Sequence, residues 1–494
     1  MRYILAIDQG TSSSRCILYD QQANPVAMAQ RSFKQHFPHP GWVEHDAEEI
    51  WTSQAGVFQQ AMLKAQLRPA DIAGIGITNQ RETTVIWERS TGKPIYNAIV
   101  WQDRRTADDC IRLKQAGFES MVKAKTGLLL DAYFSATKIS WLLDHVEGAR
   151  EQAERGELAF GTIDSWLVWK LTNGELHITD VSNAARTLLF NIDTMLWDDE
   201  LLALFDIPSS LLPEVKTSSE IYGQTRNPEI GAGIPIAAIA GDQQAGLFGQ
   251  LCINASMAKC TYGTGSFLMM NTGPQRVASS HGLLTTIAWQ IGNEIHYALE
   301  GSVFVGGAVI QWLRDGLELF EQASDSEQLA GSVDDNGGVY FVPALTGLGA
   351  PHWDPHARGA IFGITRGTTS AHLTRAALES VCFQVDDVLQ LFSVESGTPI
   401  VQLRIDGGAA VNNLLAQFQA DISAVEVVRP TNLETTALGA AYLAGIAIGL
   451  WTIDELNQKW RIDRSFHKKM RPQEDESLKR YWLKAVERTK NWIE

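Results

Sequence analysis

Residues 2–20 read RYILAIDQGTSSSRCILYD, and they carry the first strong indication of the fold. Two short apolar runs, residues 3–7 and 16–19, flank a polar segment that contains Gly10. This pattern predicts a strand, a tight turn and a second strand. Glycine permits a sharp turn and lets backbone N–H groups approach an anion closely. Asp8 ends the first apolar run, where its carboxylate can hold a metal ion through water.

The polar turn offers a cradle for phosphate, because its side chains add hydroxyl donors and a fixed positive charge to the backbone amides. These side chains are Thr11, Ser12, Ser13 and Arg15. An ordinary hairpin with a polar turn explains the same residues. Other segments of the sequence are needed to distinguish a phosphate-binding turn from an ordinary one.

Length and charge limit what the chain can be. A chain of 494 residues is long enough for two domains, each with its own core. We place the boundary after residue 248, which gives domains of residues 1–248 and 249–494. The 41 Lys and Arg residues and the 57 Asp and Glu residues give a net charge of −16. This charge argues against nucleic acid or an anionic membrane surface as the main partner.

Cysteine usage and hydropathy predict a cytoplasmic protein. The five cysteines are odd in number and form no Cys-x-x-Cys pair, so neither a disulfide framework nor a zinc site is indicated. No signal-peptide apolar region precedes Asp8. The longest apolar stretch, residues 437–451, is shorter than the roughly 18 residues that a membrane span needs. We interpret that stretch as a buried helix.

Polar residues follow two predicted buried strands. Arg81 and Glu82 stand just after one strand, where open α/β sheets place ligand-binding groups, although a surface ion pair would show the same sequence. Asp242 lies between a strand at residues 234–240 and a predicted helix of small residues at 245–251. Its carboxylate can serve chemistry at the strand end or cap the helix, and the two roles are compatible.

A second glycine hairpin is predicted in the second half of the chain, where residues 259–267 read KCTYGTGSF between apolar runs. It echoes the first hairpin and suggests a duplicated domain that closes on one phosphate chain from both sides. Further glycine turns follow where a nucleotide can meet the backbone without obstruction. The residues at these turns are Gly306, Gly307 and Gln311, and Gly407, Gly408 and Asn412.

Several motifs of common enzyme classes are absent from the sequence. There is no Gly-x-x-x-x-Gly-Lys-Ser/Thr loop, no Gly-x-Gly-x-x-Gly fingerprint, no protein-kinase motif set and no Gly-x-Ser-x-Gly elbow. These absences disfavour a P-loop enzyme, a dinucleotide oxidoreductase, a protein kinase and an α/β-hydrolase.

Two longer segments carry a resemblance to a known family. Residues 133–141 read YFSATKISW and resemble the first signature of the FGGY carbohydrate kinases, and residues 359–379 resemble the second. The order of the two hairpins and the Asp406-Gly-Gly turn resembles the actin-like ATPase superfamily, to which this family belongs. The resemblance implies an α/β fold of two ribonuclease-H-like domains. Each would have a mixed central sheet flanked by helices, with the active site in the interdomain cleft.

The resemblance extends along nearly the whole chain to the family members that phosphorylate glycerol. The segments that carry it are residues 8–15, 40–46, 77–84, 241–244, 262–265 and 350–354. It implies that glycerol is bound by Arg81, Glu82, Trp101, Tyr133, Asp242, Gln243 and Phe267. It implies that the nucleotide is held by Thr11, Ser12, Ser13, Arg15, Thr264, Gly307, Gln311, Gly408 and Asn412. The metal residues would be Asp8 and Asp242.

The implied reaction is the ATP-dependent phosphorylation of glycerol to sn-glycerol 3-phosphate, the entry step of glycerol catabolism. Asp242 would be the catalytic base, with ATP and Mg²⁺ as cofactors. The resemblance also implies a homodimer or homotetramer without stable membrane insertion.

Two other interpretations remain open. A member of the same family could act on a pentulose or a hexonate, but the compact pair of Arg81 and Glu82 with Trp101 and Phe267 favours a small polyol. An actin-like or chaperone-like ATPase would need no small acceptor. It would leave the polar set around Arg81 unexplained.

Overall fold

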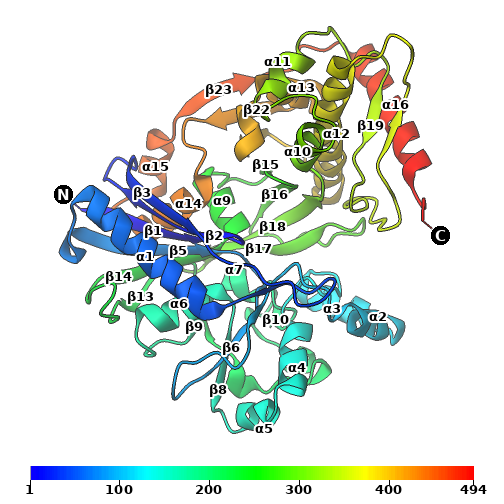
Figure 1. The fold of residues 1–494 in the computed structure, drawn as a ribbon. Coiled ribbons are helices and arrows are strands. Elements are labelled where there is room, and N and C mark those ends of the chain that lie inside the picture. Colours follow the sequence, from blue (N-terminus) through cyan, green and yellow to red (C-terminus); the bar gives the residue numbers. More distant parts are fainter. Residues whose placement is uncertain (1, 494) are drawn as a thin grey trace. The chain divides into compact units, whose positions relative to one another are not determined.

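The structure is a computed structural model that describes residues 2–493. The chain forms two compact units. Unit 1 comprises Met1–Leu251, Thr285–Tyr297 and Thr435–Lys459, and unit 2 comprises Cys252–Leu284, Ala298–Glu434 and Trp460–Glu494. Each unit is built on a mixed sheet flanked by helices, which confirms the predicted α/β class (Figure 1). The predicted boundary after residue 248 stays a prediction.

The sheet of unit 1 has six strands in the order β13-β14-β5-β1-β2-β3. The strands are β1 (Tyr3–Gln9), β2 (Ser13–Tyr19), β3 (Pro25–Ser32), β5 (Ile72–Asn79), β13 (Ser219–Gln224) and β14 (Pro235–Gly241). The first strand pairs antiparallel with β2 and parallel with β5, and β14 continues the parallel part. The carboxyl ends of β1, β5 and β14 therefore lie at one edge of the sheet, where all three lead into predicted site residues.

Side chains of β5 show why helices cover both faces of this sheet. Ile75 and Ile77 belong to the core that also contains residues of α1 (Ala47–Ala65) and α6 (Ile163–Leu171). Gly76 points to the other face, where a Cβ atom would lie 2.1 Å from the carbonyl oxygen of Ala440 in α14 (Thr435–Ala447). Glycine is thus required for α14 to approach the strand closely.

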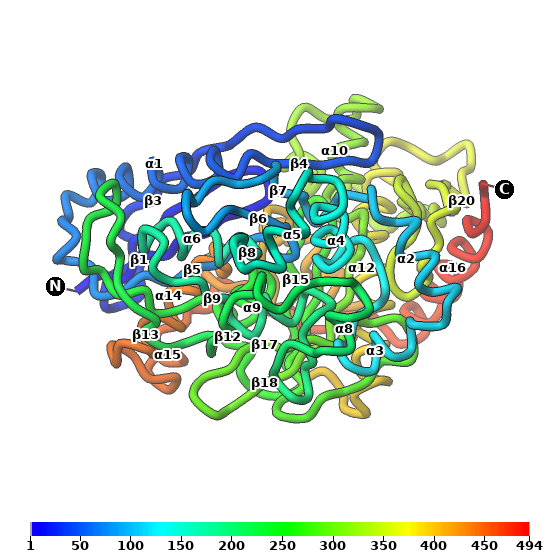
Figure 2. Tube along the Cα trace, turned by 90° about the horizontal axis from the view of Figure 1, so that it is seen from below, coloured from blue at the N-terminus to red at the C-terminus, as the bar shows by residue number. Residues whose placement is uncertain are grey.

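Helix α1 has a side-chain cap at its start and a left-handed residue at its end. The Asp46 carboxylate accepts hydrogen bonds from the amides of Glu48 (2.8 Å) and Glu49 (3.3 Å), and the helix ends at Gln66 with a left-handed φ of 55°. Helix α1 packs on β2 and β3, and Figure 2 shows α1 beside β3. This packing holds the first hairpin against the core of unit 1.

The small-residue helix predicted after Asp242 is α9 (Asp242–Gly249), and it packs tightly on α14. A Cβ atom on Gly439 would lie 1.8 Å from the carbonyl oxygen of Ala245, so the two helix backbones are in direct contact. The apolar stretch at 437–451 is accordingly mostly a buried helix, as predicted. Within residues 2–493, no helix is both long and apolar enough to cross a membrane.

A second sheet has the order β17-β18-β16-β15-β21-β22-β23, and its strands β15, β16, β21, β22 and β23 lie wholly in unit 2. The strands are β15 (Met257–Tyr262), β16 (Ser266–Gly273), β17 (Leu284–Ile291), β18 (Glu294–Val303), β21 (Gln402–Asp406), β22 (Glu426–Pro430) and β23 (Ile462–Phe466). Strand β15 is antiparallel to β16 and parallel to β21, which repeats the pairing of β1 with β2 and β5. This repeat agrees with the duplication suggested by the two glycine hairpins.

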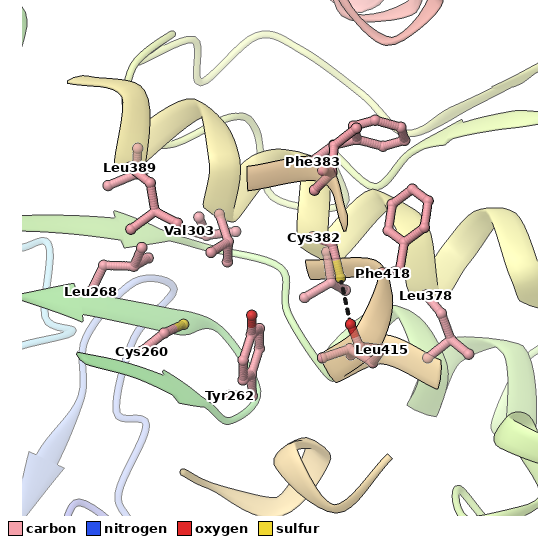
Figure 3. Packing of buried hydrophobic residues seen from close by; sticks show 14 of the residues in the cluster. Cys260, Tyr262, Leu268, Val303, Leu378, Cys382, Phe383, Leu389, Leu415 and Phe418 are labelled. Carbon is pink, nitrogen blue, oxygen red and sulfur yellow. Dashed lines mark hydrogen bonds between the residues drawn. The ribbon is translucent and has the colours of Figure 1, made fainter. Parts of the chain in front are cut away.

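The core of unit 2 joins this sheet to long helices (Figure 3). Side chains of α12 (Ser370–Ser396) and α13 (Asn413–Ser423), including Phe383 and Phe418, lie over the strand residues Tyr262 and Leu268. The other helices of this unit are α10 (Ala308–Asp315), α11 (Asp325–Ala330) and α16 (Pro472–Thr489). The core fixes the strand ends that carry the second hairpin.

Shorter elements complete the chain. The strands are β4 (Glu44–His45), β6 (Val85–Glu88), β7 (Ala98–Ile99), β8 (Leu158–Gly161), β9 (Ile178–Asp180), β10 (Phe190–Asn191), β11 (Leu196–Trp197), β12 (Glu214–Lys216), β19 (Tyr340–Val342) and β20 (Ala360–Phe362). The helices are α2 (Ala107–Gln115), α3 (Glu119–Thr126), α4 (Ala136–His145), α5 (Ala149–Glu154), α7 (Val181–Ala184), α8 (Asp199–Leu204) and α15 (Ile453–Lys459).

Candidate active site

The first hairpin has the tight turn that its sequence predicts. The Gly10 amide donates to the carbonyl oxygen of Ser13 at 2.9 Å, and Asp8 faces Arg15 across the two strands. The guanidinium Nη1 of Arg15 lies 4.0 Å from the Asp8 carboxylate. The indole Nε1 of Trp101 donates to the Thr11 hydroxyl at 2.9 Å. The turn is therefore linked to a predicted glycerol residue, while its role in phosphate binding stays a prediction.

Arg81 and Glu82 are buried, so the alternative of a surface ion pair is wrong. The two residues are only 3% and 1% exposed. Glu82 has a left-handed φ of 62°, and the Thr83 amide donates to the carbonyl oxygen of Arg81 at 2.7 Å. Such a tight turn at a non-glycine residue is strained and is typical of functional sites.

The Arg81 guanidinium connects several predicted glycerol residues. Its Nε lies 3.2 Å from the Asp242 carboxylate and 3.8 Å from that of Glu82. Its Nη2 is 3.5 Å from the Tyr133 hydroxyl, and Nη1 donates to Gln244 at 3.2 Å. One planar cation thus touches groups from three separate segments of the chain.

Two aromatic rings border this polar set. The rings of Trp101 and Tyr133 meet edge to face at 5.5 Å between centroids. Tyr133 lies just before α4, and its backbone amide donates to Asp131 at 2.8 Å. Both residues are half-buried.

Asp242 is the first residue of α9, so the alternative in which it is the N-cap of the helix is wrong. Gly241 occupies the N-cap position, and the helix starts three residues earlier than predicted. The sequence favoured a later start because Gly-Asp-Gln-Gln looks like a loop, whereas tight packing on α14 extends the helix to the strand end. The Asp242 carboxylate accepts from the Gln243 amide at 2.7 Å, and its side chain is 31% exposed.

Asp8 and Asp242 influence each other electrostatically. Burial raises the pKa of the Asp8 carboxyl from 3.8 to about 6, with Arg15 lowering it and the Asp242 charge raising it further. Two carboxylates that repel each other can share a hard cation, and Mg²⁺ takes one or two carboxylates together with phosphate oxygens and water. No group of three or more His, Cys, Asp or Glu side chains suited to a metal exists among residues 2–493. The two carboxylates thus fit Mg²⁺ bound largely through a nucleotide.

The predicted nucleotide residues of unit 2 gather around the second hairpin. The amides of Gly306 and Gly307 donate to the carbonyl oxygens of Thr264 and Gly263, both at 2.8 Å. A Cβ atom on Gly307 would lie 2.8 Å from the Gly263 carbonyl oxygen, so this approach requires glycine. The Gln311 amide donates to the Gly307 carbonyl at 3.0 Å, which places Gln311 one helical turn beyond Gly307.

The third glycine turn meets the same hairpin. Gly407 has a φ of 87°, and a Cβ atom there would lie 2.6 Å from the carbonyl oxygen of Tyr262. Nothing lies within 4 Å of a Cβ position on Gly408, so backbone is open on that side. Asn412 caps α13 by accepting from the Leu415 amide at 2.9 Å.

The site residues thus form two sets, one in each unit. The set of unit 1 holds Asp8, Thr11, Ser12, Ser13, Arg15, Arg81, Glu82, Trp101, Tyr133, Asp242 and Gln243, and the set of unit 2 holds Thr264, Phe267, Gly307, Gln311, Gly408 and Asn412. The predicted position of the active site between two domains stays a prediction, as do the individual roles.

Sequence reasoning missed two buried cations beside the unit 1 set. Lys138 is fully buried and donates to the carbonyl oxygens of Tyr133 (2.8 Å) and Phe134 (3.2 Å). Burial lowers the pKa of Lys138 to about 8. Arg186, also fully buried, donates from Nε to the Glu82 carboxylate at 2.6 Å. A single charge within the otherwise uncharged segment 181–192 is the sequence signal that marks Arg186.

Comparison with known proteins places the chain in a family. Residues 3–249 match the FGGY family of carbohydrate kinases, N-terminal domain, and residues 258–448 match its C-terminal domain. Two relatives named glycerol kinase, from Parabacteroides distasonis and Burkholderia multivorans, are 61% and 59% identical over 494 residues, covering 100% of this chain and 99% of each relative.

Solved structures share the fold. That of Plasmodium falciparum glycerol kinase with ADP is 37% identical, has a TM-score of 0.94 and covers 99% of this chain and 98% of that chain. The ligand-bound xylulose kinase from Lactobacillus acidophilus has a TM-score of 0.89 at 23% identity, with the same coverage, and shows the likeness of fold. The predicted resemblance is confirmed, and the chain belongs to the FGGY family of carbohydrate kinases.

Proposed function

We propose that the protein transfers the γ-phosphoryl group of ATP to glycerol and so forms sn-glycerol 3-phosphate and ADP. The observation that supports this most directly is the Asp242 carboxylate, which lies at the end of β14 beside the buried Arg81 guanidinium. A part-exposed carboxylate among buried polar groups suits a base that must meet a small polar substrate. The full-length likeness to proteins named glycerol kinase supports the same conclusion.

The chemistry of the unit 1 set fits a small polyol. Glycerol has three hydroxyl groups, which need converging donors and acceptors. Arg81, Glu82, Tyr133, Asp242 and Gln243 supply a cation, two carboxylates, a phenol and an amide. Because such polar groups would be left unpaired by an analogue that lacks a hydroxyl, the set discriminates against it. In this proposal Trp101 and Phe267 cover the apolar C–H face of the substrate.

The proposed reaction is an in-line displacement. Asp242 accepts the proton of a terminal glycerol hydroxyl as that oxygen bonds to the γ-phosphorus, and the bond from phosphorus to the bridging oxygen of ADP breaks. Arg15 and the turn hydroxyls Thr11, Ser12 and Ser13 neutralise charge on the transferring group. Asp8 and Asp242 would hold Mg²⁺, which neutralises charge on the β- and γ-phosphates when bound.

The unit 2 set would hold the rest of the nucleotide. Thr264 lies in a turn whose backbone packs on Gly307, and such glycine-rich turns leave amides free to approach phosphate. The open backbone at Gly408, with Asn412 after it, suits the adenosine part. We also propose that the protein is cytoplasmic and forms a homodimer or homotetramer, in line with the implications of the family.

Acceptor-dependent release of ADP tests the proposal. The purified protein with Mg-ATP is assayed without acceptor and with glycerol, xylulose or gluconate. We expect turnover with glycerol alone. Turnover with a larger sugar would retain the family chemistry and overturn the glycerol assignment, whereas ATP turnover indifferent to every acceptor would indicate a nucleotide-driven ATPase.

Replacing Asp242 by Asn tests the base. The variant keeps the shape of the side chain and loses its basicity, so we expect kcat to fall by about 10²- to 10⁴-fold while both substrates still bind. Asp108→Asn, at an exposed carboxylate in α2, is the matched control and should retain full kcat. Near-normal turnover of Asp242→Asn would remove Asp242 from the base role.

A further inference from the structure

Arg186 lies two residues after α7 and has no place in the proposed chemistry, yet it is among the most deeply buried charges of unit 1. Its residue is 0% exposed. Its Nε donates to the Glu82 carboxylate at 2.6 Å, and its guanidinium carbon lies 5.6 Å from the centroid of the Tyr133 ring and 5.1 Å from that of Phe134. One buried cation thus contacts two predicted glycerol residues.

The Glu82 carboxylate needs such a partner because it is itself 1% exposed. Its distance to the Arg186 Nε, 2.6 Å, is shorter than its 3.8 Å separation from the Arg81 Nε. Arg186 therefore supplies the short ion pair, and the Arg81 guanidinium lies nearer to Asp242, at 3.2 Å. When two cations lie at different distances from a buried carboxylate, the nearer one interacts with it more strongly and determines its orientation.

The backbone of Glu82 is held by other groups. Its carbonyl oxygen accepts from the hydroxyls of Ser135 (2.9 Å) and Thr84 (3.1 Å). With the main chain fixed in its left-handed turn, the direction of the carboxylate is set by the side-chain pair with Arg186. Cation–π contact with the Tyr133 ring extends the same control to the phenol.

The chain around Arg186 is also fixed independently of its side chain. The Ala136 amide donates to the carbonyl oxygen of Thr187 at 2.9 Å, and the Asn183 side chain exchanges hydrogen bonds with Asn79 at 2.9 and 3.2 Å. The Gly241 amide donates to the Ser182 hydroxyl at 2.9 Å. Residues 182–187 therefore contact the ends of β5 and β14 and the start of α4 through groups other than the Arg186 guanidinium.

We propose that Arg186 is a positioning residue of the acceptor site, which fixes the Glu82 carboxylate and the Tyr133 ring for the substrate hydroxyls without touching the substrate. This inference rests on the proposed glycerol site. It predicts that loss of the guanidinium weakens the use of glycerol and leaves the use of ATP intact.

The test is steady-state kinetics of Arg186→Met and Arg186→Lys in the full chain. Met replaces the aliphatic stem and removes the guanidinium with its charge, and Lys keeps a charge without the planar fork that pairs with a carboxylate. We expect the KM for glycerol to rise about 10- to 100-fold in Arg186→Met, with the KM for ATP within about 2-fold of the original, and a smaller rise in Arg186→Lys.

Arg105→Met is the matched control. The Arg105 side chain is 1% exposed, and its ion pairs, with Glu44 at 2.7 Å and with Asp103 at 2.8 Å, involve none of the predicted glycerol residues. We expect this variant to lose stability and to keep both KM values. A comparable rise in the KM for glycerol in Arg105→Met would mean that any buried ion pair of unit 1 has the effect, and would overturn the proposal.

A double-mutant cycle with Glu82→Gln isolates the pair. If Arg186 acts through Glu82, most of the effect of Arg186→Met disappears when Glu82 is already Gln. Full additivity, an unchanged KM for glycerol, or failure of both Arg186 variants to fold would overturn the proposal. Absence of glycerol-dependent turnover in the unmodified protein would refute the proposed function itself, so the two failures are distinguishable.

Discussion

Gly241→Ala changes the candidate site by one methyl group. Gly241 has a φ of −57°, which alanine adopts without strain, so the substitution acts through space alone. The added Cβ atom would lie 2.7 Å from Cδ and 2.8 Å from Cγ of Arg81, and 2.9 Å from Oε1 of Gln244. Arg81 is buried on its other sides and cannot move away freely.

The size of the effect follows from these distances. Carbon atoms in ordinary contact are about 3.5–4.0 Å apart, so the Arg81 side chain must shift by about 1 Å. A displacement of this size in a group that orients substrate costs about 10²-fold in rate. We therefore expect kcat/KM for glycerol to fall about 100-fold, which is about 2.7 kcal/mol of transition-state stabilisation. Overpacking should also lower the free energy of unfolding by about 1–3 kcal/mol.

Initial rates of ADP release at varied glycerol and varied ATP measure this prediction. The KM for ATP should be unchanged, because Gly241 adjoins the acceptor set. Gly56→Ala in α1 is the matched control, since its Cβ atom meets only a guanidinium nitrogen of Arg31 at 3.8 Å. It should retain full activity and gain up to about 1 kcal/mol of stability. Unchanged kcat/KM for glycerol in Gly241→Ala would refute the placement of Arg81 in the acceptor site.

Three further predictions concern buried groups of unit 1. In Lys138→Met, removal of a buried charge stabilises the folded state by about 3 kcal/mol, a value that corresponds to the fall in pKa from 10.5 to about 8, and this offsets the loss of two hydrogen bonds. We therefore expect the KM for glycerol to rise while the urea midpoint changes little, and an unchanged KM would contradict this. Burial raises the pKa of Asp164 from 3.8 to about 7, so the folded state loses stability as pH rises through that range. Asp164→Asn should therefore raise the free energy of unfolding, measured with urea, by roughly 3 kcal/mol more at pH 8 than at pH 5, and equal increases at the two pH values would contradict this. Gly76→Ala should lower the free energy of unfolding by about 3 kcal/mol or more, because its Cβ atom would lie 2.1 Å from a backbone oxygen. In Gly74→Ala the Cβ atom would lie 3.3 Å from the movable Ile448 side chain, so the cost should be about 1 kcal/mol, and the reverse order of the two costs would refute the packing argument.

Much of the local structure was predictable because short-range rules determine it. Glycine between two apolar runs defined both hairpins, and the Asp46 cap defined the start of α1. The start of α9 was wrong by three residues, because its packing on α14 involves a helix nearly two hundred residues away in the chain. Local sequence carries no information about such a contact.

The two hairpins, the mixed α/β class, the family signatures and the polar residues at the strand ends could be predicted from the amino-acid sequence, since each depends on residue types at fixed spacing. How these residues meet depends on tertiary packing. It buried Arg81 and Glu82, placed Asp242 within 3.2 Å of the Arg81 guanidinium, and brought Arg186 to 2.6 Å from Glu82 across 104 positions of sequence. The physical reason is that a buried charge takes its partner from whichever segment the packing of helices on the sheet brings near, and that packing is a property of the whole fold.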